Sequence, residues 1–178
     1  ICLTLGLLVF LGMPLGQAQT AKQIAKARED IAELQSKLRQ SNDRSNQGAK
    51  LLLQLMDLAD QYGRPFTLIQ AGKRFVVSNP DHVRHPEVML KLIDAQLITA
   101  REKDAVSTAR QFIVRHAGHP QIAEIHRLLA ALLERDGKLS AAAQELVLAY
   151  ESQQGHLADA ALAVQYYRRE NSHRSAAE

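Results

Sequence analysis

The feature that constrains the fold most is a series of short apolar stripes separated by turns at glycine and proline. From residue 51 onward, apolar side chains recur every three or four positions, which is the spacing of one face of an α-helix. The stripes are interrupted at YGRP (62–65), SNPD (78–81), RHAGHP (115–120) and RDGK (135–138). Glycine suits the residue after a helix, and proline suits the first turn of the next helix. The pattern therefore predicts consecutive helix pairs over 51–170.

Composition supports an all-α fold and argues against nucleic-acid binding. No segment shows the alternation of polar with β-branched or aromatic residues that is typical of strands, and aromatic residues make up 4% of the chain. The net charge is +3, and the basic residues are scattered, with no run longer than the pairs Lys73-Arg74 and Arg168-Arg169. Nucleic-acid-binding proteins more often gather their basic residues on one face. We therefore expect protein partners and no nucleic acid.

The helix pairs recur along the chain. Three pairs of residues are separated by 34 positions: Pro86 and Pro120, Ala109 and Ala143, and Phe112 and Leu146. An interval of this size is typical of stacked helix pairs, each of which is too small to bury its apolar face alone. The loop length shifts by three residues between the segments NPDH and HAGH. We therefore predict a stack of helical hairpins with a repeat of about 34 residues.

The order of large and small apolar residues over about 51–153 resembles the tetratricopeptide repeat. The matching positions are Leu58, Ala59, Tyr62, Ala71 and Phe75 in the first repeat and Leu129, Ala130, Leu133, Ala142, Leu146 and Ala149 in the last. In the middle repeat Gln96 and Thr108 replace small residues, and the tryptophan that leads the family's repeat is absent throughout. The resemblance implies an all-α solenoid of helical hairpins.

The same resemblance implies a partner-binding surface on the first helix of each repeat. Transferred to this chain, its positions are Met56 and Asp60 in the first repeat, Leu90, Ile93 and Leu97 in the second, and Arg127 in the third. The apolar residues would hold an apolar face of a partner helix or peptide, and the arginine would pair with a carboxylate of the ligand. The alternative is that Leu90, Ile93 and Leu97 pack against the N-terminal helix or a neighbouring hairpin.

The first 18 residues, ICLTLGLLVFLGMPLGQA, predict a signal peptide that is cleaved after Ala18. Positions 1–15 are almost entirely apolar, and the small residues Gly16 and Ala18 suit a signal-peptidase site. The alternative is an uncleaved membrane anchor. The only cysteine, Cys2, lies in this segment, so the cleaved chain would have no disulfide and no cysteine-based metal site. We therefore expect a periplasmic or otherwise extracytoplasmic protein, with membrane anchoring as the alternative.

Residues 19–40 have the pattern of an amphipathic helix, and residues 41–50 that of a polar linker. Apolar residues recur at alternating spacings of three and four: Ile24, Ala27, Ile31, Leu34 and Leu38. This is the a/d seam of a short coiled coil, so it predicts a homo-oligomer; the alternative is a helix packed on its own domain. The segment SNDRSNQGAK (41–50) indicates a domain boundary, and residues 171–178 indicate a polar tail.

Four histidines form two similar pairs in the expected loops between hairpins: His82 with His85, and His116 with His119. Stacked hairpins place such loops roughly 10 Å apart, which is wide for a shared zinc ion. We therefore expect no metal and no other cofactor, and a histidine metal site is the alternative. No motif of a hydrolase, metalloprotease, nucleotide-binding or dinucleotide-binding enzyme is present. We expect a protein that is not an enzyme.

These features together predict an extracytoplasmic scaffold or adaptor that binds a peptide or protein on the concave face of its repeats. The order of signal peptide, short coiled coil and repeats resembles the periplasmic proteins associated with the Tol–Pal envelope machinery. Two alternatives stay open: an exported metal-binding module that uses the histidine loops, and a structural spacer in an envelope complex.

Overall fold

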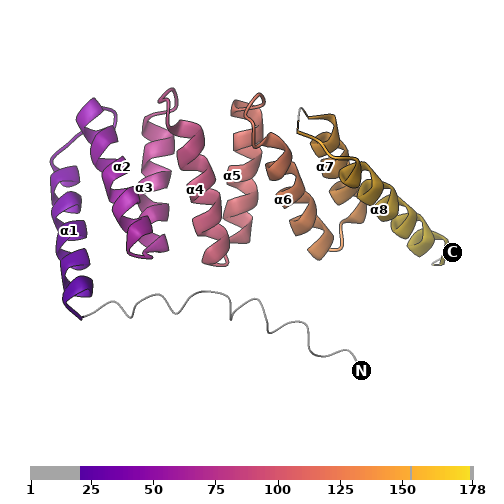
Figure 1. The fold of residues 1–178 in the computed structure, drawn as a ribbon, viewed down its shortest axis with the longest axis horizontal. Helices are drawn as coiled ribbons and strands as arrows, with labels where there is room; N and C mark the ends of the chain where they lie inside the picture. Colours follow the sequence, from indigo (N-terminus) through magenta and orange to yellow (C-terminus); the bar gives the residue numbers. More distant parts are fainter. Residues whose placement is uncertain (1–20, 153, 177–178) are drawn as a thin grey trace.

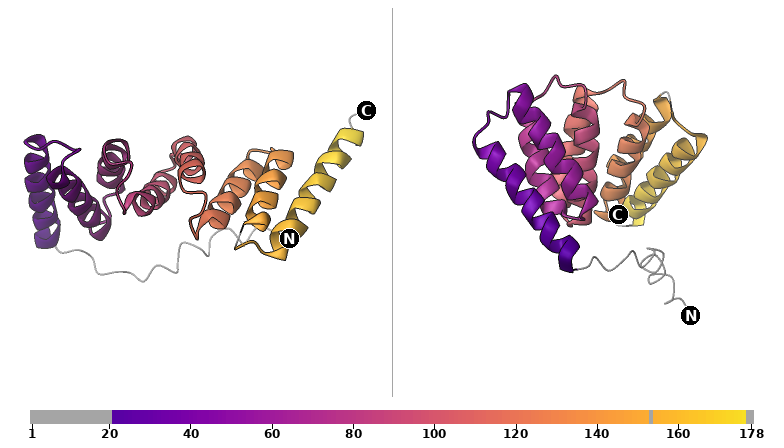
Figure 2. Two further views of the ribbon diagram at one scale, coloured as in Figure 1. Left: turned by 90° about the horizontal axis from the view of Figure 1, so that it is seen from above. Right: turned by 60° about the vertical axis from the view of Figure 1, so that its left-hand side comes forward.

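The computed structural model describes residues 21–152 and 154–176, and this part of the chain consists of α-helices joined by short turns (Figure 1). The helices are α1 (Ala21–Arg39), α2 (Asn46–Gln61), α3 (Pro65–Ser78), α4 (His85–Ile98), α5 (Glu102–Arg115), α6 (Ile122–Arg135), α7 (Leu139–Glu151) and α8 (Leu157–Ala176). Each helix packs mainly on the helices before and after it, which gives the elongated row of Figure 2. The predicted all-α fold of stacked hairpins is confirmed.

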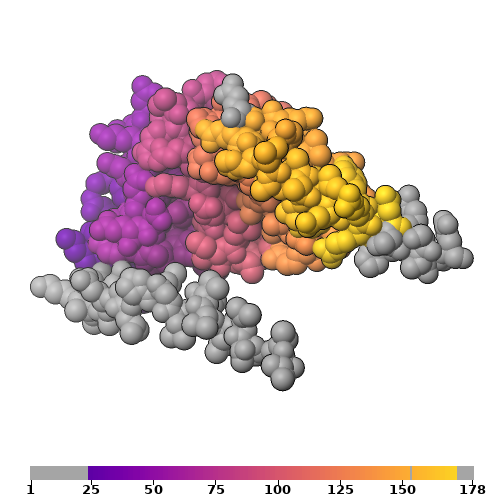
Figure 3. All heavy atoms as spheres, turned by 45° about the vertical axis from the view of Figure 1, so that its right-hand side comes forward, coloured from indigo at the N-terminus to yellow at the C-terminus, as the bar shows by residue number. Residues whose placement is uncertain are grey.

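The interior is divided into three apolar clusters that follow one another along the chain. The first joins α1, α2, α3 and α4 and contains Leu52 and Phe75. The second joins α4, α5 and α6 and contains Ile93 and Phe112, and the third joins α6, α7 and α8 and contains Tyr166. In the space-filling view the successive repeats form one continuous body with α8 at one end (Figure 3). Each hairpin therefore depends on its neighbours for burial of its apolar side chains.

The structural repeat is 37 residues long, and the predicted interval of 34 was wrong. Gly63, Ala100 and Gly137 follow one another at this interval, and they are the described residues with positive φ angles, of 59°, 57° and 74°. The N–H of each donates to the carbonyl oxygen three residues earlier, at the end of α2, α4 or α6. The prolines misled the sequence analysis because Pro86 is the second residue of α4, whereas Pro120 lies two residues before α6.

Of the segment predicted as a linker at 41–50, only residues 41–45 form a loop, and this loop is tied to the first hairpin. Helix α2 already begins at Asn46, after Ser45 accepts a capping hydrogen bond through its side chain. The guanidinium of Arg74 in α3 donates two hydrogen bonds to the Asp43 carboxylate, at 2.8 and 2.6 Å. The side-chain amide of Asn79 donates to the Asp43 carbonyl oxygen at 3.0 Å. The loop therefore holds α1 and the following hairpins together.

The two ends of the chain differ in how much of them the structure describes. Helix α8 continues to Ala176, so the expected polar tail is helical up to that residue. The predicted signal peptide at 1–18 lies outside the described residues. Among the helices that are described, none is both long enough and apolar enough to cross a membrane.

Candidate partner-binding cleft

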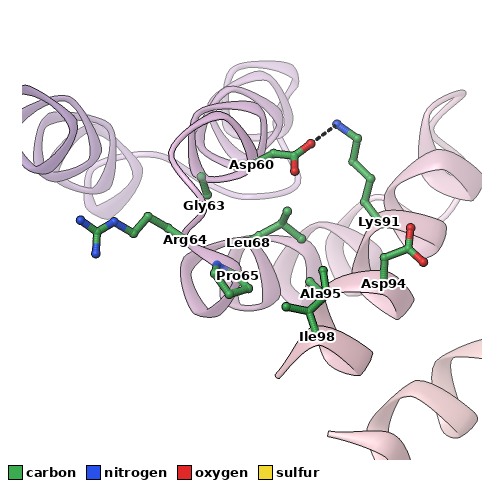
Figure 4. A pocket seen from close by; sticks show the side chains of 10 residues that line it. Asp60, Gly63, Arg64, Pro65, Leu68, Lys91, Asp94, Ala95 and Ile98 are labelled. Atoms are coloured by element: carbon green, nitrogen blue, oxygen red, sulfur yellow. Dashed lines mark hydrogen bonds and ion pairs between the residues drawn. The ribbon is translucent and has the colours of Figure 1, made fainter. Parts of the chain in front are cut away.

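An open cleft of about 490 Å³ lies at the junction of the first two repeats, between α2, α3 and α4 (Figure 4). Its walls come from the end of α2, the turn into α3, the first turn of α3 and the second half of α4. The chain reverses at Gly63, where the left-handed backbone conformation is open to glycine without strain. Pro65 then starts α3, since proline fits the first turn of a helix.

The floor of the cleft is apolar, and one large apolar side chain stands exposed beside it. Ala59, Leu68 and Ala95 line the floor and are buried. Ile98, the last residue of α4, also lines the cleft, but 77% of it is exposed. An aliphatic side chain that is exposed next to an apolar hollow offers contact area to a partner.

The rim of the cleft is charged and is lined by two carboxylates, Asp60 and Asp94, and two cations, Arg64 and Lys91. The ammonium of Lys91 lies 3.2 Å from Asp57 and 3.4 Å from Asp60, so two carboxylates of α2 share one lysine of α4. Asp94, one turn after Lys91, has no hydrogen bond or ion pair with any residue in the described part of the chain. Partial burial, and then the nearby charge of Asp60, raise the pKa of Asp94. Arg64 also lines the cleft, but in Figure 4 its side chain points away from Asp60 and Asp94.

Of the predicted partner-binding residues, Asp60 lies in the cleft and the apolar ones do not. Met56 and Ile93 are each 1% exposed and belong to the first and second apolar clusters. Leu90 and Leu97 are partly buried against the second cluster. For Leu90, Ile93 and Leu97 this is packing within the chain, as in the alternative interpretation, because the second cluster joins α4 to α5 of its own hairpin and to α6 of the next.

Arg127 is engaged inside the chain rather than presented to a ligand. Its guanidinium donates to both carboxylate oxygens of Asp159, at 2.8 and 2.9 Å, and to the carbonyl oxygen of Gln154 at 2.9 Å. Asp159 also accepts the backbone N–H of His156 at 2.9 Å, so it caps the first turn of α8. Arg127 therefore links α6 to α8. The carboxylate that was predicted to come from a ligand is that of Asp159 in the same chain.

The predicted oligomerisation seam packs on the chain's own domain. Ala27 and Leu38 are buried, and Ile31 and Leu34 pack against the first apolar cluster. Ile24, near the start of α1, is half-buried. These contacts correspond to the alternative of an amphipathic helix on its own domain. The homo-oligomer expected from this seam stays a prediction.

Two of the four loop histidines meet, although their loops were expected to lie too far apart. Nδ1 of His85 is 2.9 Å from Nε2 of His116, so one ring donates a hydrogen bond to the other. Burial lowers the pKa of both rings, and a neighbouring histidine lowers each further: His116 for His85, and His119 for His116. The expectation of a wide separation was wrong for this pair, because His85 begins α4 and His116 follows α5, so both lie at the same end of one hairpin.

His82 and His119 hold equivalent places, 37 residues apart, and bind the backbone. Nδ1 of each accepts the N–H of the residue two positions on, at 3.1 and 3.2 Å. Their rings lie edge-on to Phe75 and Phe112, with centroids 5.1 and 5.2 Å apart. Over residues 21–152 and 154–176 no group of three or more metal-binding side chains converges. His82 and His119 thus hold their own loops, whereas His85 and His116 contact each other.

Sequence reasoning missed Lys91, Asp94 and Ile98, although a signal for them was present. They stand three and four positions apart on α4 and so share one helix face. Lys91 follows Asp57 and Asp60 at roughly one repeat length, as expected for opposite charges on neighbouring stacked helices. The adjoining apolar stripe of α4 is the stronger sequence pattern, and it packs against the second apolar cluster.

Comparison with known proteins gives one informative result, which concerns the fold. No family model matches the sequence, and no curated protein matches it. Among solved structures, the chain is similar to the crystal structure of MamA, a protein of tetratricopeptide-repeat fold, with a TM-score of 0.55 and 17% sequence identity. The match covers 88% of this chain and 95% of that one. It supports the tetratricopeptide-like architecture over most of the length.

Proposed function

We propose that this protein is a non-enzymatic interaction scaffold that holds a short segment of a partner protein in the cleft between α2, α3 and α4. The observation that carries the proposal is the combination of an apolar floor, the exposed side chain of Ile98 and incompletely neutralised carboxylates in one open hollow. Repeat proteins of this architecture typically bind partners along surfaces of this kind.

The size of the cleft favours a peptide segment over a whole folded surface. A volume of about 490 Å³ is in the range that accommodates a few side chains. The cleft is open to solvent along the junction of the repeats, so an extended or helical segment has access to it (Figure 4). The stack itself supplies a rigid frame, since hairpins on both sides hold α2 and α4 in place.

The compartment belongs to the same proposal. The sequence pattern of residues 1–18 favours export, and the absence of cysteine after Cys2 suits an extracytoplasmic chain without disulfides. We infer that the scaffold acts outside the cytoplasm, in the cell envelope. Fusion of residues 1–18 to a reporter that is active only after export tests this part, and a reporter that stays inactive would contradict it.

The binding proposal is tested with the full chain immobilised and panned against a phage-displayed library of random heptapeptides. Ile98→Gln removes the exposed aliphatic contact, and Val114→Gln is the matched control, because Val114 is 82% exposed near the end of α5 and away from the cleft. We expect peptides enriched on the unaltered chain to bind about tenfold more weakly to Ile98→Gln and unchanged to Val114→Gln. A purely structural spacer would enrich no peptide, or would enrich peptides that bind all three proteins equally.

A further inference from the structure

We propose that the cleft selects a partner segment in which a lysine or arginine stands next to an apolar side chain. This inference rests on the proposed function, because it assigns the chemistry of the segment that the cleft would bind. It follows from the balance of charges at the rim, the apolar floor, and the contrast with the next junction of the stack.

The charges around the rim leave a deficit of cations. Arg84 donates two hydrogen bonds to Glu87, at 2.8 and 2.7 Å, and its nearest Asp57 oxygen is at 3.6 Å. Lys91 is then the one cation that reaches Asp57 and Asp60 at closer range. With Asp94 added, this side of α2 and α4 carries four carboxylates and the two cations Arg84 and Lys91; a third cation, Arg64, lines the cleft but points away from Asp60 and Asp94 (Figure 4). A partner cation would meet negative charge that the chain does not itself neutralise.

Asp94 is the carboxylate that would gain most from such a cation. It lines the cleft, is exposed to solvent, and has Asp60 as a like-charged neighbour. An ammonium or guanidinium beside it would offset that repulsion. Lysine and arginine also carry long apolar stems, which would lie along Leu68 and Ile98 while the charged head reached the rim. A neighbouring apolar side chain would fill the rest of the floor.

The same positions in the next repeat show that this charge is specific to one junction. Asp60 and Lys91 face each other between α2 and α4. Advanced by the 37-residue repeat, these positions are Leu97 and Leu128, between α4 and α6. Both leucines are partly buried against the second apolar cluster. The second junction is therefore occupied by apolar packing, whereas the first carries charged groups and an open cleft.

Other kinds of ligand fit the charged and apolar groups of the cleft less well. An anion would meet excess negative charge at the rim. A calcium ion takes six to eight oxygen ligands, and no group of three or more suitable side chains converges in residues 21–152 and 154–176. An acidic peptide would have to pair with Arg64, whose side chain points away from Asp60 and Asp94 in Figure 4, or displace the bonds of Lys91 to Asp57 and Asp60. A cationic segment keeps all existing pairs and adds one.

The test uses the heptapeptides enriched on the unaltered full chain. We expect most of them to contain lysine or arginine beside an apolar residue. In a synthetic copy of one such peptide, replacement of its basic residue by norleucine should weaken binding about tenfold, as measured by fluorescence anisotropy. Asp94→Asn, which keeps the shape of the side chain, should weaken the original peptide similarly and leave the norleucine peptide unchanged. Asp136→Asn, in the turn between α6 and α7, makes the same change in net charge and should have no effect.

The outcomes separate the two proposals. Peptides that are enriched and depend on Ile98, but lack basic residues, would overturn the cation preference and leave the scaffold function standing. Equal binding of the basic peptide to the unaltered chain and to Asp94→Asn would also overturn the preference. Failure to enrich any peptide would instead contradict the proposed function itself.

Discussion

Ala100 occupies a backbone position that glycine holds in the two neighbouring repeats, so exchanging alanine and glycine there should change stability in opposite directions. The φ angle of Ala100 is 57°, against 59° for Gly63 and 74° for Gly137. A side chain at such a position is strained by contact of its Cβ with the following carbonyl oxygen. Ala100→Gly should therefore raise the free energy of unfolding, and Gly137→Ala should lower it.

The size of the effect follows from two opposing contributions. The left-handed conformation costs an alanine about 1–2 kcal/mol, and the greater freedom of glycine in the unfolded chain offsets about 0.4–1 kcal/mol. The net change is about 0.5–1 kcal/mol in each direction. No heavy atom lies within 4 Å of a Cβ added at Gly63 or Gly137, so a new methyl group would meet no side chain. The difference would therefore report backbone conformation alone.

Urea unfolding followed by circular dichroism measures these changes, which correspond to melting shifts of about 1–4 °C. Gly118→Ala is the matched control: the added Cβ would also meet nothing within 4 Å, but the φ angle of Gly118 is not positive. This control should be neutral or slightly stabilising. A loss of stability in Ala100→Gly, or equal behaviour of Gly137→Ala and Gly118→Ala, would contradict the assigned repeat and its strained turn.

Three further predictions concern the half-buried His116 and the buried residues Gln96 and Gly48. Because the pKa of His116 is lower in the folded chain than in the unfolded chain, its contribution to stability should be complete above about pH 7 and should be lost as the pH falls through the folded-state pKa. Thermal melts at several pH values should therefore show a smaller acid-induced loss of stability in His116→Asn than in the unaltered chain. The side-chain amide of Gln96 is buried with neither polar atom hydrogen-bonded, so Gln96→Leu should raise the free energy of unfolding by about 1–2 kcal/mol in urea titrations; a loss would contradict this. A Cβ at Gly48 would overlap the backbone of Asn42 and Asp43, so Gly48→Ala should lower the free energy of unfolding by about 1–3 kcal/mol and the melting temperature by several degrees. This loss should exceed that of an alanine substitution at any exposed position of α2.

The fold could be predicted because helix periodicity and turn residues are local properties of the sequence. The repeat length was harder to infer, since the left-handed turn position carries alanine at Ala100 and glycine only in the repeats on either side. Without a glycine at position 100, the 34-residue interval between Pro86 and Pro120 was easier to see, although Pro86 lies inside α4 and Pro120 lies before α6. The alanine at the strained position 100 thus made the 37-residue repeat hard to recognise in the sequence.

The candidate site was less accessible to sequence reasoning, because it depends on which helix faces the neighbours cover. Ile93 and Lys91 stand two positions apart on α4, yet one is buried in the second cluster and the other lies at the rim of the cleft. His85 and His116 meet because the start of α4 lies beside the end of α5 within one hairpin. Such contacts depend on how the helices pack, and the pattern along a single helix does not contain them.

The packing of α1 on α2 has a consequence for how copies of the protein could assemble end to end. In a row of similar hairpins, the outer side of a terminal hairpin resembles the surfaces that pack together inside the row, so a second molecule could pack on it in the same way. Here Ala27 and Leu38 of α1 already occupy the outer side of the first hairpin. A second copy could therefore contact the apolar side of the first hairpin, as hairpins contact one another within the chain, only if α1 moved aside.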